Sequence, residues 1–327
     1  MPIDVLMLQL GTPTEPTAKG LRPYLRQFLS DPRVIEAPAI VRWMLVNLII
    51  VPFRSPKSAE KYKRIWDDKT GSPLLSITRS QQQALAEKLG PDYRVSFAMR
   101  YGEPSVAKVV DELMKKKSQR MIILPMFPQY SATTTASGLD AIFQTLQKYR
   151  VVPALRVIRD YHDDPDYLDA ITNMIKHHRD KAIADGKQPE MYLISFHGIP
   201  INYIKRGDPY MRQSAITGKA IAKRMGWKKG DWKLVFQSRL GGQKWLTPYT
   251  DETLKSLGRQ GVKRVLVAQP GFTADCLETI DEIGYEGQEE FEETGGEELI
   301  RVPCANDDPG FIEALANIVR RESFGWI

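Results

Sequence analysis

Short apolar runs alternate with amphipathic stretches along most of the chain. The runs are largely apolar on both faces, which is typical of strands buried in a parallel sheet that helices cover on either side. The stretches between them have the spacing of amphipathic helices, as in residues 80–89, 105–116, 166–178 and 309–321. The pattern therefore predicts an α/β fold. The expected strands are residues 5–10, 95–99, 121–126, 155–158, 191–196, 234–237, 265–268 and 299–302.

The two halves of the chain repeat the same order of short motifs. Gly-x-Pro follows the first expected strand at residues 11–13 and the fifth at residues 198–200, and Arg-x-Gly recurs at residues 100–102 and 239–241. The second strand comes later in the first half than in the second, which indicates an insertion. We therefore predict two tandem doubly wound, Rossmann-like parallel-sheet domains with a cleft between them. The expected bounds are 1–150 and 151–327, with the insertion at about 20–75 and the last helix packed back on the first domain.

The insertion contains an unusual segment, residues 39–53, in which Arg42 and Asn47 are the polar side chains. At this length the segment is too short to span a bilayer, which takes about 20 residues. It is also apolar on every face, unlike a helix that is half exposed to water. Two interpretations stay open. The segment is either a buried core helix or a lip that dips into a membrane or closes over an apolar ligand.

Charge and motif content narrow the classes of function. The 327 residues carry a net charge of +6, which suits an anionic membrane surface or an acidic substrate. Arginine-rich helices, RNA-binding motifs and zinc-finger spacings are absent from the sequence, so no nucleic acid partner is expected. Without GxGxxG or a P-loop no nucleotide is expected. Cys276 and Cys304 form no CxxC, so no iron–sulfur cluster is expected, and the lack of a signal peptide predicts a cytoplasmic protein.

One histidine and one acidic stretch are candidates for chemistry. His197 directly follows an expected strand, and the carboxyl end of a strand in such sheets faces the ligand crevice. Asp275, Glu278, Glu282 and Glu286 are three or four residues apart, which places them on one helical face. Repulsion within this row raises carboxyl pKa values and favours proton acceptors. The alternatives are a hydrogen-bonded core histidine and a solvated acidic face.

Further polar residues are candidates for binding an acidic group on a ligand. Arg54 and Lys57 follow the apolar segment, and with Tyr62 and Ser72 they offer two cations and two hydroxyls. For the two cations the alternative is ordinary surface charge. Tyr130 precedes a hydroxyl-rich start of a helix at residues 131–135, which suits a carboxylate but also simple helix capping.

Six ordered motifs resemble the ferrochelatase family, in particular its proteobacterial branch. They are LGTP at 10–13, GSPL at 71–74, FPQYSATTT at 127–135, SFHGIP at 195–200, FQSRLGGQKWLTPYTDETL at 236–254 and PGFTADCLETIDEI at 270–283. The resemblance implies a chelatase-type fold and the insertion of Fe²⁺ into protoporphyrin IX with release of two protons, the last step of haem synthesis. Leu10 stands where the branch that uses coproporphyrin has tyrosine, which favours protoporphyrin IX.

The resemblance also implies roles for individual residues. His197 and Glu278 match the pair that handles metal and protons, and Glu282 and Glu286 continue the acidic path as further metal ligands. Arg54, Lys57, Tyr62, Ser72, Arg100 and Tyr130 match positions that line the porphyrin pocket or its propionate end.

The implied partners are protoporphyrin IX and Fe²⁺, with no further cofactor. Residues 39–53 are expected to make peripheral contact with the inner membrane, and a porphyrinogen oxidase is the expected upstream partner. The cluster-bearing C-terminal extension of the animal enzymes is not matched. The alternatives are a coproporphyrin ferrochelatase, a non-catalytic haem or porphyrin carrier, and a cobalt or nickel chelatase.

Overall fold

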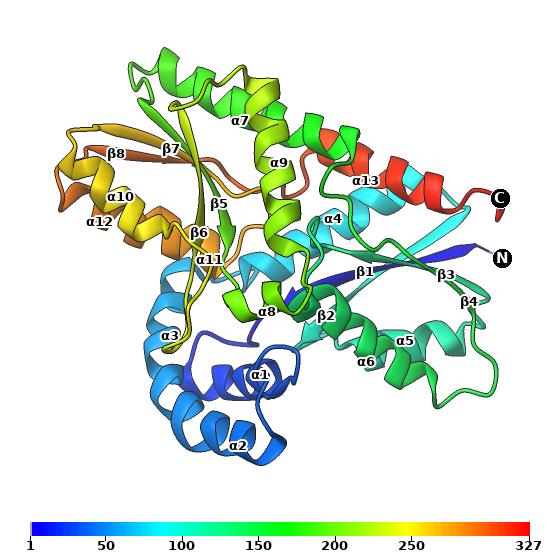
Figure 1. Ribbon diagram of the computed structural model, residues 1–327. Coiled ribbons are helices and arrows are strands. Elements are labelled where there is room, and N and C mark those ends of the chain that lie inside the picture. The colour runs from blue at the N-terminus through cyan, green and yellow to red at the C-terminus, as the bar shows by residue number, and fades with distance from the viewer. Residues whose placement is uncertain (1) are drawn as a thin grey trace. The chain divides into compact units, whose positions relative to one another are not determined.

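A computed structural model describes residues 2–327 and divides them into two compact units (Figure 1). The first unit comprises the residues up to Phe127, Ser131–Asp160 and Leu315–Ile327. The second comprises Pro128–Tyr130 and Tyr161–Ala314. The chain therefore changes unit near Asp160, and its last helix starts in the second unit and ends in the first. The predicted cleft concerns the placement of one unit against the other and stays a prediction.

The first unit contains a parallel four-stranded sheet in the order β2-β1-β3-β4. The central strand β1 is buried along almost its whole length, which explains why its sequence is apolar on both faces. The strands are β1 (Ile3–Gly11), β2 (Tyr93–Tyr101), β3 (Arg120–Pro125) and β4 (Ala154–Val157).

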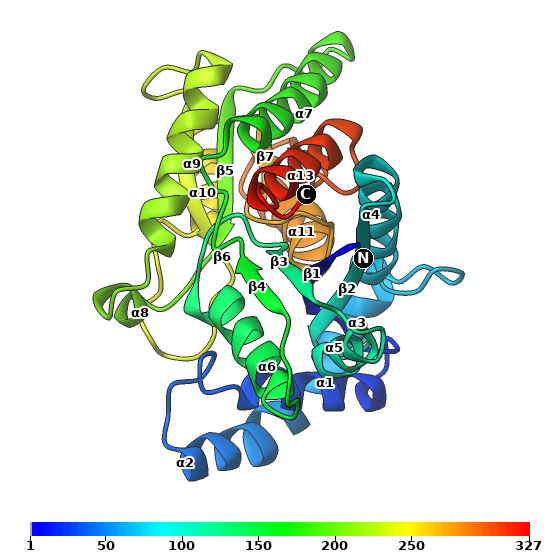
Figure 2. The same cartoon turned by 90° about the vertical axis from the view of Figure 1, so that its right-hand side faces the viewer.

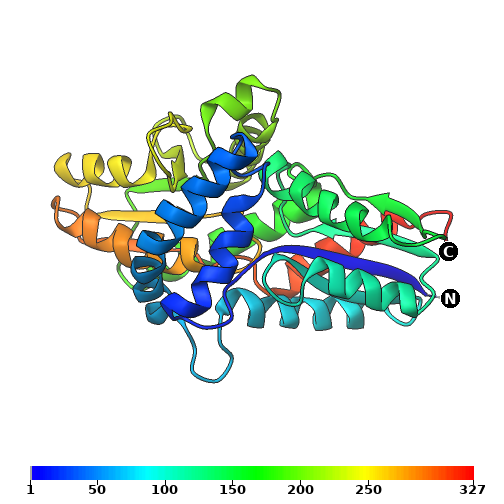
Figure 3. The same cartoon turned by 90° about the horizontal axis from the view of Figure 1, so that it is seen from below.

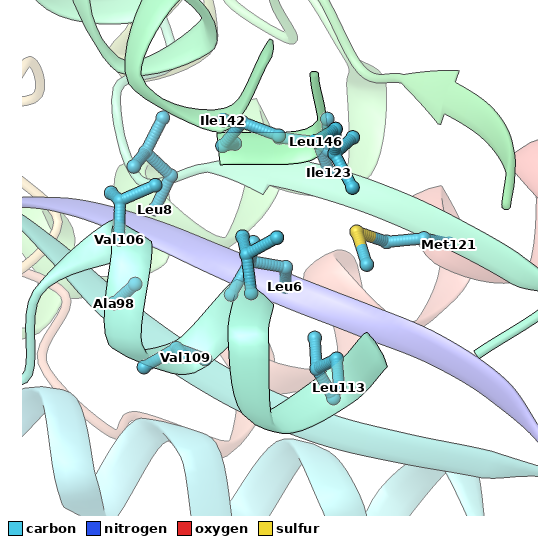
Figure 4. Close-up of a cluster of buried hydrophobic side chains, with 11 residues drawn as sticks. Leu6, Leu8, Ala98, Val106, Val109, Leu113, Met121, Ile123, Ile142 and Leu146 are labelled. Carbon is cyan, nitrogen blue, oxygen red and sulfur yellow. The ribbon is translucent and has the colours of Figure 1, made fainter. Parts of the chain in front are cut away.

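Alternate residues of these strands face different helices. Leu6 and Leu8 of β1 point to the same face as Met121 and Ile123 of β3, and they pack against α5 (Val106–Lys115) and α6 (Ser137–Leu146) (Figure 4). The opposite face contacts α4 (Pro73–Leu89). The C-terminal end of α13 (Pro309–Glu322) lies beside α4, where the Arg320 guanidinium donates to the Lys88 carbonyl oxygen (Figure 2).

Between β1 and β2 the first unit carries its insertion. It begins with α1 (Ala18–Ser30), whose first turn is capped by the Thr17 hydroxyl. The chain then forms one continuous helix from α2 (Ala39–Met44) through the π-helix η1 (Leu45–Ile50) to α3 (Val51–Ile65), and α3 packs against α1 (Figure 3).

This long helix exposes most of the apolar segment, so the interpretation as a buried core helix was wrong. Trp43 is 58% exposed, Ile40 75% and Phe53 74%, whereas Val46 and Val51 are buried. The whole helix, Ala39–Ile65, is long and apolar enough to cross a membrane by length and composition, with 17% of its most apolar window buried. Exposed apolar side chains gathered on one helix are typical of a surface that meets a membrane, a ligand or another protein.

The second unit repeats the same sheet in the order β6-β5-β7-β8, again fully parallel. All eight expected strands are therefore confirmed, and so is the α/β class with two parallel sheets. The strands are β5 (Met191–His197), β6 (Trp232–Gln237), β7 (Arg264–Ala268) and β8 (Glu298–Arg301). The matching strand order is what a duplicated half predicts.

Helices cover both faces of the second sheet as well. Leu193, Val235 and Val267 pack against α10 (Thr250–Arg259) and α12 (Gly287–Glu292). The alternate residues Ile194 and Leu234 face α9 (Tyr210–Met225), which approaches closely enough that its Gly218 leaves little room for a side chain. In Figure 1, α7 (Pro165–Ala184) lies beside α9. Between β5 and β6 this unit has only α8 (Ile201–Lys205) and α9, so the long apolar helix has no counterpart there.

Candidate functional site

His197 lies at the carboxyl end of β5, in register with Gln237 at the end of β6. Its Nδ1 atom is 2.6 Å from the carbonyl oxygen of Gly198, which can only accept a hydrogen bond. This contact assigns a proton to Nδ1, so that in the neutral tautomer the lone pair is on Nε2. The ring is half-buried, with the aromatic rings of Trp245 and Phe272 at centroid distances of 6.5 Å each. This geometry leaves Nε2 as a base in an apolar surrounding.

The acidic residues lie on a helix that changes its type along its length. It begins with α11 (Leu277–Thr279), widens into the π-helix η3 (Ile280–Glu286) and continues into α12. In a π-helix each amide bonds to a carbonyl five residues back, so the turns are wider than in an α-helix. Glu278, Glu282 and Glu286 therefore follow one another along nearly the same side of the helix. Short π-helical turns within α-helices are frequent at functional sites.

Two glutamines tie the start of this helix to the sheet. The side-chain amides of Gln237 and Gln269 donate to the carbonyl oxygen of Glu278 at 2.7 and 3.3 Å. Gln237 itself accepts from Gln269 and from the hydroxyl of Ser195, both at 2.9 Å, and is 2% exposed. Because Gln237 pairs with His197 across the strands, the base and the first acid share one rigid frame.

The pKa of Glu282 is shifted by the residues around it. Burial raises the pKa of its carboxyl group, and the negative charge of Glu278 adds to this, while hydrogen bonds from Ser238 and the positive charge that His197 carries when its ring is protonated act in the opposite direction. The net direction is upward, so Glu282 holds a proton at a higher pH than an ordinary glutamate. Glu282 is thus close enough to both members of the predicted catalytic pair to interact with them electrostatically.

The prediction that Asp275 belongs to the same acidic face was wrong. Asp275 lies before the helix begins, is 6% exposed, and its Oδ1 accepts from the Arg301 guanidinium at 2.7 Å and the Thr279 hydroxyl at 2.8 Å. The side-chain amide of Asn306 donates to Oδ2 at 2.9 Å. Burial alone would raise the pKa of this carboxyl, but the Arg301 charge and these hydrogen bonds outweigh it and lower the pKa. Asp275 therefore holds the start of the acidic helix in place.

This arrangement predicts how stability changes in Asp275→Asn. At neutral pH we expect a loss of about 2 kcal/mol in the free energy of unfolding, the size typical of hydrogen bonds to a charged group. The folded pKa lies below the unfolded one, so the stabilisation is present above about pH 4 and is lost as pH falls through the folded pKa. Urea unfolding at pH 7 and at a series of pH values from about 4 down to about 2 tests this. A difference between the variant and the wild type that stays constant with pH would contradict it.

Both cysteines are free and buried. Burial raises the pKa of the Cys276 thiol well above its usual range, and the neighbouring Glu278 carboxylate adds to this. Burial likewise raises the pKa of Cys304, with Asp275 contributing. The two thiols therefore stay protonated at neutral pH and act as packing residues beside the acidic helix.

In the first unit, Arg100 is held by a buried network. Its guanidinium donates to the carboxylate of Asp31 at 2.6 Å and to the hydroxyl of Ser137 at 2.7 Å. Asp31 also accepts from Ser137 at 2.5 Å and from the hydroxyl of Tyr101 at 2.9 Å. Burial would raise the pKa of Asp31, but these bonds and the Arg100 charge lower it. Arg100 thus fixes the junction between α1, β2 and α6, and its role as a pocket arginine stays a prediction.

The other predicted binding residues fall into two groups. Arg54 and Lys57 are exposed on α3, so they are available to an acidic group. Tyr62 and Ser72 are buried, with 6% and 3% of their surface exposed. The ring of Tyr62 packs edge-on against that of Trp66, and the Ser72 hydroxyl oxygen is 2.8 Å from the Thr12 hydroxyl oxygen.

Tyr130 belongs to the second unit and is partly buried. Its main-chain N–H donates to the Gln213 side chain at 2.6 Å. The Ser131 hydroxyl accepts from the Thr133 N–H at 3.2 Å, so the capping interpretation of this turn holds.

The structure thus brings together His197, Glu278 and Glu282 in the second unit. Sequence reasoning missed Ser238 and Gln237, which touch the acidic helix. Gln237 is the last residue of β6 and Ser238 follows it. Because the carboxyl ends of parallel strands meet at one edge of the sheet, these positions in the sequence could have indicated that both residues lie near His197. Arg239, also just after β6, turns away to Asp251 at 2.9 Å.

Two parallel four-stranded α/β units, with a histidine and two glutamates gathered in the second unit, are the arrangement expected of a metal chelatase. The chain matches the Ferrochelatase family over residues 3–323 and belongs to it. It is 44% identical to the ferrochelatase of Idiomarina loihiensis, over 99% of this chain and 89% of that protein. It is also 44% identical to the ferrochelatase of Chromobacterium violaceum, over 98% and 88%.

Solved structures agree on the fold. SirB from Bacillus subtilis, solved with Fe³⁺, superposes with a TM-score of 0.57 at 12% identity and covers 100% of this chain and 97% of its own. DR2241 from Deinococcus radiodurans, described as similar to chelatases with two additional domains, gives a TM-score of 0.51 over 98% of this chain and 54% of its own. The chelatase-type fold predicted from the sequence is therefore confirmed.

Proposed function

We propose that this chain inserts Fe²⁺ into protoporphyrin IX to form protohaem, with release of two protons, as the last step of haem synthesis and as a lyase. The observation that carries the proposal is the His197 ring, whose Nδ1 contacts the Gly198 carbonyl, which leaves Nε2 to act as the base near the carboxyl groups of Glu278 and Glu282. A carrier without catalysis has use for the histidine as a ligand but little use for the carboxylates.

Metallation exchanges two pyrrole N–H protons for one divalent ion. In the proposed mechanism, Nε2 of His197 accepts a pyrrole proton, as a neutral imidazole can near neutral pH. Glu278 offers a negative charge to Fe²⁺, which is a substrate here. Glu282, with its raised pKa, accepts protons in turn, and Glu286 extends the path along η3.

The porphyrin itself needs apolar contact and a place for two carboxylates. Trp245 and Phe272 beside His197 offer flat apolar surfaces. We propose that Arg54 and Lys57 bind the propionates, assisted by Tyr62, Ser72 and Tyr130, and that Arg100 supports this end from its ion pair with Asp31. No further cofactor is proposed, neither an iron–sulfur cluster nor a nucleotide.

The proposed preference for protoporphyrin IX rests on Leu10, the penultimate residue of β1, where the resemblance places tyrosine in the branch that uses coproporphyrin. An assay of metal insertion with the two porphyrins side by side tests it. We expect the higher kcat/KM with protoporphyrin IX and turnover well beyond one equivalent of protein. The variant Leu10→Tyr serves as the matched control. A higher kcat/KM with coproporphyrin would replace the substrate assignment, and a single equivalent of product would favour a carrier.

The proposed location is the cytoplasm, with peripheral contact to the inner membrane through residues 39–53. Support comes from the exposed apolar side chains of the long helix and from the basic residues that follow them on α3, which suit anionic lipid headgroups. Protoporphyrin is poorly soluble in water, so we propose that the chain takes it up at the membrane from the porphyrinogen oxidase that produces it.

A further inference from the structure

Ser238 has a backbone conformation that few residues other than glycine adopt. Its φ angle is +61°, in the left-handed region, where a side chain crowds the following carbonyl group. In the described part of the chain only Lys117 and Asn306 share this feature among non-glycine residues. A serine kept in this conformation directly after β6, at the same sheet edge as His197, calls for an explanation from its contacts.

Ser238 contacts the carboxylate of Glu282. The Ser238 hydroxyl donates to Oε2 of Glu282 at 2.5 Å, and the Ser238 main-chain N–H is close enough to this carboxylate to favour its charged form. The left-handed turn allows the N–H and the hydroxyl of one residue to point at the same group. A carboxylate offers about four lone-pair sites, so sites remain on Glu282 for a cation or a proton beside the hydroxyl of Ser238.

The surroundings hold the Ser238 turn from both sides. On one side, the Gly198 N–H donates to the Gln237 carbonyl at 2.6 Å, and a Cβ atom at Gly198 would lie 2.9 Å from the Ser238 carbonyl oxygen. On the other side, the Arg239 guanidinium pairs with Asp251 and lies over the ring of Tyr249 at 4.2 Å. The turn is thus fixed before any substrate arrives.

Gln237 and Ser238 therefore hold the acidic helix at two successive points. Gln237 binds the main chain at Glu278, and Ser238 binds the side chain of Glu282 one turn later. The main-chain contact sets where the helix starts. The side-chain contact sets which way its second carboxylate faces.

We infer that Ser238 is a positioning residue for metal entry: its left-handed turn orients the Glu282 carboxylate so that its remaining lone pairs receive the divalent ion. This inference rests on the proposed function, since it assigns Glu282 to the metal path. It predicts that loss of the hydroxyl weakens the interaction with the metal and leaves the interaction with the porphyrin unchanged.

Two variants separate the hydroxyl from the backbone. Ser238→Gly removes the hydroxyl and suits the left-handed turn, whereas Ser238→Ala removes the hydroxyl and keeps the crowding. We expect both to raise the KM for Zn²⁺ about tenfold, the value of one hydrogen bond to a charged group, with the porphyrin KM unchanged. Lys117→Gly is the matched control for a glycine gained at a positive φ in the first unit, and we expect wild-type kinetics for it.

The decisive measurement is a double-mutant cycle with Glu282→Gln. In that background we expect Ser238→Gly to change the KM for Zn²⁺ less than twofold, because the partner carboxylate is gone. A wild-type KM for Zn²⁺ in Ser238→Gly, or an equal effect with and without the carboxylate, would overturn the inference. Calorimetric titration of Zn²⁺ without porphyrin gives the same comparison, so Ser238 is tested even if the wild type fails to insert metal.

Discussion

Replacing His197 with alanine is expected to lower the rate of metal insertion by about 10²–10⁴-fold, the usual contribution of a positioned general base. The Nδ1–H of this ring is held by the Gly198 carbonyl, so the whole basicity of the side chain is at Nε2. The residue is half-buried and lies at the end of a strand, so its loss leaves the core of the second unit intact. Zn²⁺ insertion followed by fluorescence, with thermal unfolding measured in parallel, checks both expectations.

Two further variants sharpen this result. His197→Asn keeps a polar side chain of similar width but has no base, so we expect it to be as slow as the alanine variant. Glu278→Gln keeps the main-chain carbonyl that Gln237 and Gln269 bind and removes only the charge, so we expect a large loss of rate with a normal melting temperature. Near-normal rates in His197→Ala and Glu278→Gln would show that the proton and metal roles lie elsewhere.

Replacing Trp43, Leu45 and Ile49 together with serine or asparagine is expected to weaken binding to lipid vesicles by at least about 100-fold. Trp43 is 58% exposed and Ile49 55% exposed, and transfer of such side chains from water into an apolar phase contributes about 1.5–3 kcal/mol each. Because these side chains are largely outside the core, the variant should remain folded. Co-sedimentation with vesicles that contain anionic phosphatidylglycerol, together with porphyrin binding by fluorescence quenching, measures the effect.

The control for this experiment is an exposed apolar residue far along the sequence. Phe324 is 87% exposed near the C-terminus, so Phe324→Ser removes one exposed apolar side chain outside the long helix. We expect vesicle binding of this variant to match the wild type. If the triple variant binds vesicles and porphyrin as the wild type does, the exposed helix serves some other contact.

The strands could be predicted because a strand that is buried on both faces is apolar at nearly every position. Runs such as residues 191–196 have no polar face, and only a sheet covered on both sides accommodates several of them. The location of the apolar helix at residues 39–53 could not be predicted in the same way. Composition alone does not distinguish an apolar helix inside the protein from one on its surface, and Trp43 and Phe53 lie on the surface.

Candidate site residues could be predicted where the type of side chain indicates the chemistry. Features of the site that depend on backbone conformation could not be predicted. His197 and the glutamates were found from their place after strands and their spacing. The same spacing wrongly included Asp275, because nothing in the sequence shows that Arg301 and Asn306 bind it. The π-helix and the left-handed turn at Ser238 are backbone states, and their cause is contact with groups that are distant in the sequence.

The two units share a strand order, yet only the first carries the long insertion between its first two strands. His197, Gln237, Ser238 and the acidic helix all come from the second. The first copy thus carries the added helices, while the second has only α8 and α9 at the equivalent place. Under the proposed function, evolution could retune which tetrapyrrole is accepted by changing the insertion, without disturbing the residues that exchange protons for metal.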